Sequence, residues 1–183
     1  MGSDERAASG EPEESRRSRT SSLLAPRSSL TVRSATAADL ETVVALRLAL
    51  LREHASNPVY SRLRADAPQR ARRLFAAQLV SPAEVTLLAE RVGEVVGILR
   101  CVESAGSPLL FPERYGYVSS VYVRPEARRR GVLRRLLEQA ERWCAARGLD
   151  ELRLHSTADG ESGNAAWSAL GFEVVEHSRA KKI

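Results

Sequence analysis

Residues 121–135 read VYVRPEARRRGVLRR and place five arginines within eight residues around a single glycine, Gly131. The preceding run YVSSVYV, residues 117–123, alternates as a strand does, and Pro125 stops it. Residues 132–148 then carry apolar side chains along one helical stripe and end at Gly148, a typical C-terminal stop. A strand, a glycine turn and a helix can bind an anion, because the first amides of a helix lack internal partners.

Three interpretations of this arginine-rich turn remain open: a cradle for one small polyphosphate, a solvated basic face, or a helix that binds nucleic acid. The apolar stripe with Leu136, Leu137 and Trp143 disfavours binding in a DNA groove, since it assigns one side of the helix to a core. The nucleotide motifs GxxxxGK[ST] and GxGxxG are both absent from the sequence. We therefore favour the polyphosphate cradle, without a standard nucleotide-binding frame.

The bulk composition predicts one globular domain. The chain has 183 residues, of which 43% are hydrophobic and 28% charged, and it has no apolar run of the ~20 residues that cross a bilayer. Residues 1–28 are rich in Ser, Gly, Pro and balanced charge, so we predict a disordered tail there and a folded domain over residues 29–183. We expect a cytoplasmic protein without a membrane partner, with Cys101 and Cys144 as reduced core thiols and with no metal site.

Periodicity predicts an α/β domain with a mixed sheet. A turn at Gly93 divides one apolar segment into a hairpin. The predicted strands are residues 30–35, the two arms of the hairpin within 84–104, and residues 117–123, 151–156 and 172–177; the predicted helices are residues 36–57, 68–79, 132–148 and 164–170.

Three segments in this order resemble the GNAT superfamily of acyl-CoA-dependent N-acetyltransferases. Residues 128–133, RRRGVL, are similar to its signature [Q/R]-x-x-G-x-[G/A], and VYVRPEAR before them resembles its strand and turn. Residues 164–172, NAAWSALGF, resemble its second segment. The resemblance covers about 150 residues from Leu30. It implies a mostly antiparallel central sheet, splayed between the fourth and fifth strands and flanked by helices.

The resemblance also implies how acetyl-CoA binds. The main chain of Val121 and Val123 would bind the pantetheine arm, and the Val121 amide would polarise the thioester carbonyl. Amides of residues 129–134 would hold the pyrophosphate, while Asn164 would bond the arm from the other side. The implied cofactor-binding residues are Val121, Tyr122, Val123, Arg128, Arg129, Arg130, Gly131, Val132, Leu133, Arg134, Asn164 and Trp167.

The sequence departs from the family pattern at two of these positions. Leu133 stands where the family usually has Gly or Ala. Trp167 stands where many members have a tyrosine that protonates the leaving thiolate, and indole is not a useful acid, so we interpret Trp167 as a packing residue.

The catalytic base is the least determined part of the prediction. Tyr117 matches the position of a glutamate base in one branch of the family, and it is either a proton relay through water or a plain sheet residue. Other candidates near the expected acceptor mouth are Glu103, Glu113, Ser119 and Ser120, and we interpret His54, His155 and His177 as structural.

The predicted function is transfer of an acetyl group from acetyl-CoA to a primary amine of a small molecule or a protein. The alternative is an acyl-CoA-binding module without turnover, and a nucleic-acid binder is a third hypothesis that we disfavour. Residues 54–73, HASNPVYSRLRADAPQRARR, fall where the family shapes its acceptor site, and their basic character favours neutral or anionic amines over polycations. The sequence leaves a homodimer open.

Overall fold

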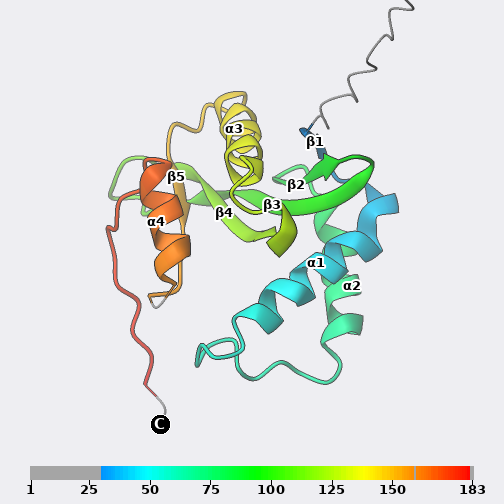
Figure 1. Cartoon of the computed structure of the whole chain (residues 1–183). Helices are drawn as coiled ribbons and strands as arrows, with labels where there is room; N and C mark the ends of the chain where they lie inside the picture. Colours follow the sequence, from blue (N-terminus) through cyan, green and yellow to red (C-terminus); the bar gives the residue numbers. More distant parts are fainter. Residues whose placement is uncertain (1–29, 159, 182–183) are drawn as a thin grey trace, which may run out of the picture.

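The structure is a computed structural model that describes residues 30–158 and 160–181. The tail predicted as disordered, residues 1–28, lies outside the described residues. A five-stranded sheet in the order β1-β2-β3-β4-β5 forms the centre of the fold (Figure 1). The strands are β1 (Leu30–Ser34), β2 (Glu84–Arg91), β3 (Glu94–Ala105), β4 (Arg114–Val123) and β5 (Leu152–Leu154).

All strand pairs except the last are antiparallel, and β4 and β5 are parallel. The predicted turn at Gly93 is confirmed: Val92 and Gly93 both have positive φ, 53° and 78°, as a two-residue hairpin turn requires. The parallel pair is possible because α3 (Val132–Ala145) crosses from β4 to β5. The predicted mixed, mostly antiparallel sheet is therefore confirmed.

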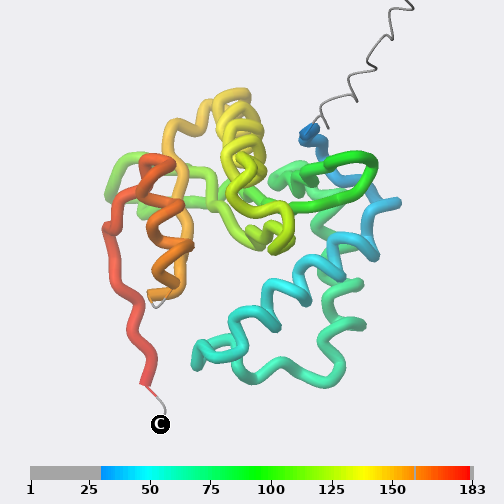
Figure 2. The backbone as a smooth tube through the Cα atoms, viewed as in Figure 1, coloured from blue at the N-terminus to red at the C-terminus, as the bar shows by residue number. Residues whose placement is uncertain are grey.

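Helices cover both faces of the sheet, which is why β2 and β3 carry continuous apolar runs rather than alternating ones. On one face α3 packs its Leu136 against Leu87 and Leu99. On the other face lie α1 (Leu40–Glu53) and α2 (Ala67–Gln78), with Leu88 in their shared core (Figures 1 and 2). The remaining helical segments are η1 (Ala37–Asp39), η2 (Pro125–Ala127) and α4 (Glu161–Ala169).

The predicted helices over residues 36–57, 68–79, 132–148 and 164–170 all exist, with shifted ends. The last predicted strand, residues 172–177, is wrong, because this segment has no regular secondary structure. Val174 and Val175 are exposed. Adjacent valines would point to opposite sides of a strand, so they form no one-sided apolar face that could hold the segment to the sheet. Figures 1 and 2 show it as an extended trace after α4.

Within residues 30–158 and 160–181, no helix is both long and apolar enough to cross a membrane.

Candidate functional site

The sheet opens between its fourth and fifth strands. The pairing of β4 with β5 covers only Gly116, Tyr117 and Val118, while β4 continues to Val123. This confirms the predicted splay. The strand β5 ends after Leu154, so residues 119–123 of β4 have no strand partner on this side of the sheet, and we call this unpaired edge the β4–β5 gap.

A β-bulge lies in β4 at the start of the gap. Ile98 of β3 pairs with Tyr122 and Arg100 pairs with Ser119, so Ser120 and Val121 both lie opposite a single residue of β3. Ser120 has a φ of 53°, a conformation that is uncommon for residues other than glycine. Bulges redirect the strand that carries them, and this one was not predicted, because the run YVSSVYV contains no glycine or other sign of an irregularity.

The main chain of β4 beyond the bulge is oriented toward the gap. The Arg124 amide donates to the Val96 carbonyl of β3 at 2.9 Å. The amide and carbonyl of successive residues point alternately to the two sides of a strand, so the amide and carbonyl of Val123 point away from β3. The same alternation implies this orientation for Val121. In agreement, the Val123 carbonyl accepts a hydrogen bond from Arg128 Nε at 2.9 Å.

The arginine-rich turn leads from β4 into α3. Gly131 is the N-cap of α3 with a φ of 79°, and Arg129 also has a positive φ, of 59°. Within the described part of the chain, no main-chain amide of residues 129–134 donates a hydrogen bond to another main-chain group. A Cβ added at Gly131 would meet no atom within 4 Å. Free amides at the positive end of a helix, with open space before them, suit a bound anion.

The arginine side chains of the turn have different surroundings. Arg128 is held by the protein itself: its guanidinium contacts Glu53 Oε2 at 2.5 Å and lies 5.8 Å from the centre of the Tyr122 ring. Arg128 thus joins the turn to the end of α1, a contact across 75 residues that the sequence did not reveal. Arg129, Arg130 and Arg134 are exposed and make no ion pair among the described residues.

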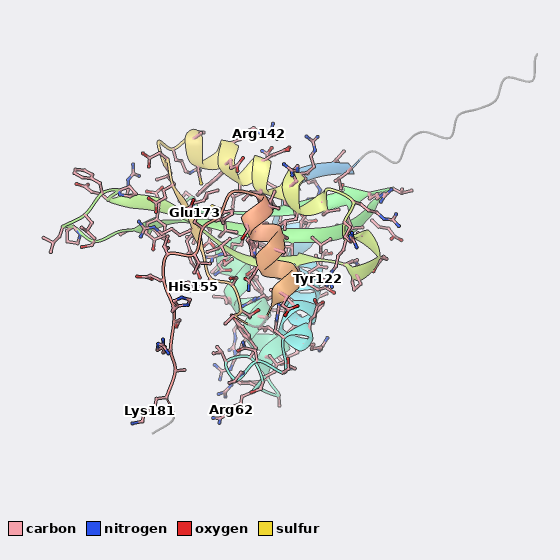
Figure 3. The ribbon with its side chains drawn as sticks, turned by 60° about the vertical axis from the view of Figure 1, so that its left-hand side comes forward. Arg62, Tyr122, Arg142, His155, Glu173 and Lys181 are labelled. Carbon is pink, nitrogen blue, oxygen red and sulfur yellow. The ribbon has the colours of Figure 1, made fainter. Side chains whose placement is uncertain are left out.

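Tyr117 and His155 meet across the β4–β5 pair. The Tyr117 hydroxyl lies 3.1 Å from His155 Nδ1, and the two rings are edge to face with centres 5.5 Å apart. Figure 3 labels His155. Burial raises the pKa of Tyr117 above its ordinary value, and Tyr60 and Tyr115 act in the same direction. The phenol is therefore protonated at neutral pH. The sequence favours a structural role for His155, because only the parallel register of β4 and β5 brings it to Tyr117.

The segment after β5 contains two further predicted residues, Asn164 and Trp167. Asn164 donates from Nδ2 to the Thr157 carbonyl at 3.0 Å, which holds the start of α4 to the loop before it. The Trp167 ring packs edge to face on Phe172 at 5.4 Å, in keeping with a packing role. Leu133, in the first turn of α3, is half-buried beside the fully buried Val132.

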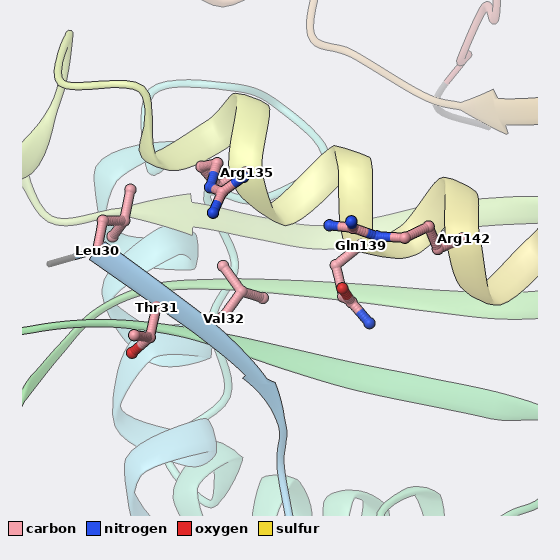
Figure 4. A pocket seen from close by; sticks show the side chains of 6 residues that line it. All are labelled: Leu30, Thr31, Val32, Arg135, Gln139 and Arg142. Atoms are coloured by element: carbon pink, nitrogen blue, oxygen red, sulfur yellow. The ribbon is translucent and has the colours of Figure 1, made fainter.

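Two other features lie apart from the gap. A pocket of about 410 Å³ between β1 and α3 is lined by Leu30, Thr31, Val32, Arg135, Gln139 and Arg142 (Figure 4), at the opposite edge of the sheet from β5. Cys101 and Cys144 are free, buried thiols with sulfur atoms 3.6 Å apart.

Among the described residues no cluster of His, Cys, Asp and Glu could hold a metal ion.

Comparison with known proteins agrees with this geometry. A family model described as "Acetyltransferase (GNAT) family" matches residues 48–172. Among solved structures, a predicted acetyltransferase with acetyl-CoA from Clostridium acetobutylicum is 17% identical, with a TM-score of 0.70 over 84% of this chain and 96% of that one. A GCN5-related N-acetyltransferase from Ralstonia eutropha JMP134 is 23% identical, with a TM-score of 0.69 over 85% and 99%.

The aminoglycoside N-acetyltransferase AAC(6')-Iy in complex with CoA is 21% identical, with a TM-score of 0.71 over 87% of this chain and 99% of that one. No curated protein gives a significant sequence match. At these identities the solved structures show a shared fold, whereas the family model covers most of the folded region at the sequence level. The chain belongs to the acetyltransferase (GNAT) family.

Proposed function

We propose that this protein transfers the acetyl group of acetyl-CoA to a primary amine by direct attack of the amine within a ternary complex. One observation carries the proposal: the β4–β5 gap is continuous along the chain with the turn at the start of α3, where the amides are free. An extended thiol arm that ends in a pyrophosphate needs a strand edge followed by an anion site. The protein offers the two in that order.

The chain's own groups then have distinct tasks. The amides of residues 129–134, with the exposed Arg129 and Arg130, bind the pyrophosphate. The Val121 main chain binds the arm beside the thioester, where its amide stabilises negative charge that develops on the carbonyl oxygen. Asn164 binds the pantetheine arm from the α4 side of the gap. Arg128 positions the turn through Glu53 and the Val123 carbonyl, and this leaves less of its charge for the cofactor.

Proton transfer falls to Tyr117 and His155 in this proposal. An alkylammonium has a pKa of about 10 and must lose a proton before it attacks the thioester. The Tyr117 hydroxyl accepts this proton, directly or through a water, as it passes its own to His155 Nδ1, 3.1 Å away. The imidazolium then returns its proton to solvent or to the departing thiolate. His155 is exposed, so exchange with solvent is open to it.

A second candidate is an acyl-CoA-binding module without turnover. Trp167 packs on Phe172 at the position where many relatives have an acidic phenol, and no indole supplies that proton. The Tyr117–His155 pair favours the enzyme, because it offers a proton path that does not need Trp167.

Two measurements together test the proposal. Thermal shift with CoA tests the cradle, and release of the free thiol from acetyl-CoA, measured over a panel of primary amines, tests transfer. We expect a shift with CoA and amine-dependent thiol release. A shift without thiol release for any amine would support the binding module, and no response to CoA combined with salt-sensitive retention on DNA would refute both candidates.

A further inference from the structure

Arg47 of α1 is a half-buried arginine without a counterion. Among the described residues it makes no hydrogen bond and no ion pair. The nearby Arg100, in contrast, is bonded to Glu84 and donates to Ser119 Oγ at 3.1 Å. Burial lowers the pKa of Arg47 from its ordinary value, although a guanidinium stays charged at any physiological pH. A desolvated charge without a partner costs stability, so a bound anion is the arrangement that would compensate it.

Arg47 lines an open pocket of about 390 Å³ between α1, the following loop and α2. This volume lies within the range of ordinary small-molecule sites. The pocket wall includes the apolar side chains of Leu48, Leu51, Leu74 and Phe75. The pocket therefore offers a charged group beside an apolar surface.

The pocket is positively charged as a whole. Of its other arginines, Arg64 and Arg70 share the single carboxylate of Asp66, while Arg62, labelled in Figure 3, makes no ion pair among the described residues. No carboxylate is among the residues that line the pocket in the described chain. A polycationic acceptor would be repelled here, whereas an anionic group would be attracted.

The pocket adjoins the proposed proton path. Burial raises the pKa of Tyr117, Tyr60 of the pocket wall raises it further, and the positive charge of Arg47 acts in the opposite direction. In addition, α1 packs directly on β4. A small molecule whose anion lies at Arg47 can therefore present a nearby amine toward Tyr117.

We propose that the acceptor is a small amine that carries a carboxylate and an apolar group, as an apolar amino acid does, and that Arg47 binds its carboxylate. This inference rests on the proposed acetyl transfer and names the acceptor class of that site. The carboxylate forms a charge-assisted hydrogen bond with the guanidinium, the apolar group lies against Leu51 and Leu74, and the amine faces Tyr117.

A matched acceptor series tests the role of the carboxylate. L-phenylalanine and L-phenylalaninamide share their carbon skeleton, and in the second a neutral carboxamide replaces the carboxylate. We expect kcat/KM for the acid to exceed that for the amide by about tenfold or more, the usual effect of one hydrogen bond to a charged group. The amide has the less basic amine and so more free amine at neutral pH, which biases the comparison against the expected result.

Substitution of Arg47 assigns the effect to this side chain. In Arg47→Met we expect kcat/KM for L-phenylalanine to fall to about the value for the amide, while the Kd for CoA stays within about twofold. Arg47→Lys should restore part of the preference. Arg73→Met is the control, since Arg73 is exposed on the same pair of helices and does not line the pocket. Arg47→Met should keep or raise Tm, because it removes a half-buried charge without a partner.

Binding of reaction products gives a readout that needs no turnover. We expect calorimetry to show tighter binding of N-acetyl-L-phenylalanine than of N-acetyl-L-phenylalaninamide, and this difference should vanish in Arg47→Met. Equal binding or turnover of acid and amide, no binding of the acid, or an unchanged preference in Arg47→Met would each overturn the inference. If CoA binding and transfer to other amines persist in that case, the proposed function survives; if CoA binding is also absent, both fail.

Discussion

Replacement of Gly131 by asparagine should separate cofactor binding from folding. Gly131 caps the N-terminus of α3 at a φ of 79°, and Gly148 follows the C-terminus of the same helix at 67°. An added Cβ meets no atom within 4 Å at either position. Asparagine tolerates left-handed backbone better than other non-glycine residues and is accepted at both ends of helices. Gly148→Asn is therefore a matched control for Gly131→Asn.

The two variants should differ in binding and not in stability. Each change should cost about 1 kcal/mol or less, which lowers Tm by about 2–4 °C in a chain of this size. At Gly131 the new side chain also enters the space before the free amides of residues 129–134, and its carbonyl competes for them. Loss of one hydrogen bond to a charged phosphate costs about 1.5–3 kcal/mol, so CoA affinity should fall about 10- to 100-fold.

Titration calorimetry with CoA, together with thermal unfolding of both variants, measures these quantities. We expect Gly148→Asn to bind CoA as the wild-type protein does, at a comparable Tm. The reasoning is refuted if folded Gly131→Asn binds CoA within about twofold of Gly148→Asn, since the turn would then hold no phosphate.

Three further outcomes follow from the contacts. Tyr117→Phe should lower kcat by about 100-fold or more with little change in the KM of acetyl-CoA, and His155→Gln should have the same effect. An unchanged kcat in both variants would exclude the proton path through Tyr117 and His155. Gly116→Ala should cost about 1–3 kcal/mol in chemical denaturation, because its Cβ would lie 2.5 Å from Cys144 Sγ. Adding Cys144→Ala should restore part of this loss, and strict additivity would contradict the contact. The hydrogen bond from Arg33 holds the pKa of Asp39 well below its usual range, so the stability that Asp39 contributes is present above about pH 4 and is lost as pH falls further. Asp39→Asn should therefore be less stable than the wild-type protein at pH 7, and its thermal unfolding should depend less on acid. Parallel curves of Tm against pH for the two proteins would contradict this.

The sequence allowed the fold to be predicted wherever local chemistry determines the structure. Pro125 ends β4, Gly131 begins α3 and Gly93 turns the hairpin, and each acts through its own backbone preference. Segments 84–104 and 132–148 were equally clear, because their apolar patterns match the cores that they form. The failed strand at residues 172–177 shows the limit of this approach, since β-branched residues favour an extended chain but do not supply a neighbouring strand.

The parts of the site that escaped prediction depend on contacts between distant residues. His155 reaches Tyr117 only through the register of two parallel strands, and Arg128 finds its carboxylate on Glu53, 75 residues earlier. Arg47 is a similar case, because a helical pattern predicts which face is buried but not whether a buried arginine has a counterion. No local rule connects these positions.

The structure also changes the meaning of the net charge of +5. Several arginines away from the site are neutralised by local carboxylates, as Arg33 is by Asp39 and Arg72 by Glu41. Arginines without such partners in the described chain include Arg129, Arg130 and Arg134 at the turn before α3 and Arg47 and Arg62 at the pocket, but also Arg73 and Arg142 elsewhere on the surface. A charge without a partner is costly where it is partly removed from water, as that of Arg47 is, whereas the exposed Arg129 and Arg130 are solvated. The two basic sites lie on different elements, one at the start of α3 and one between α1 and α2, and this separation favours two anions, a pyrophosphate and a carboxylate, over a continuous basic surface for nucleic acid.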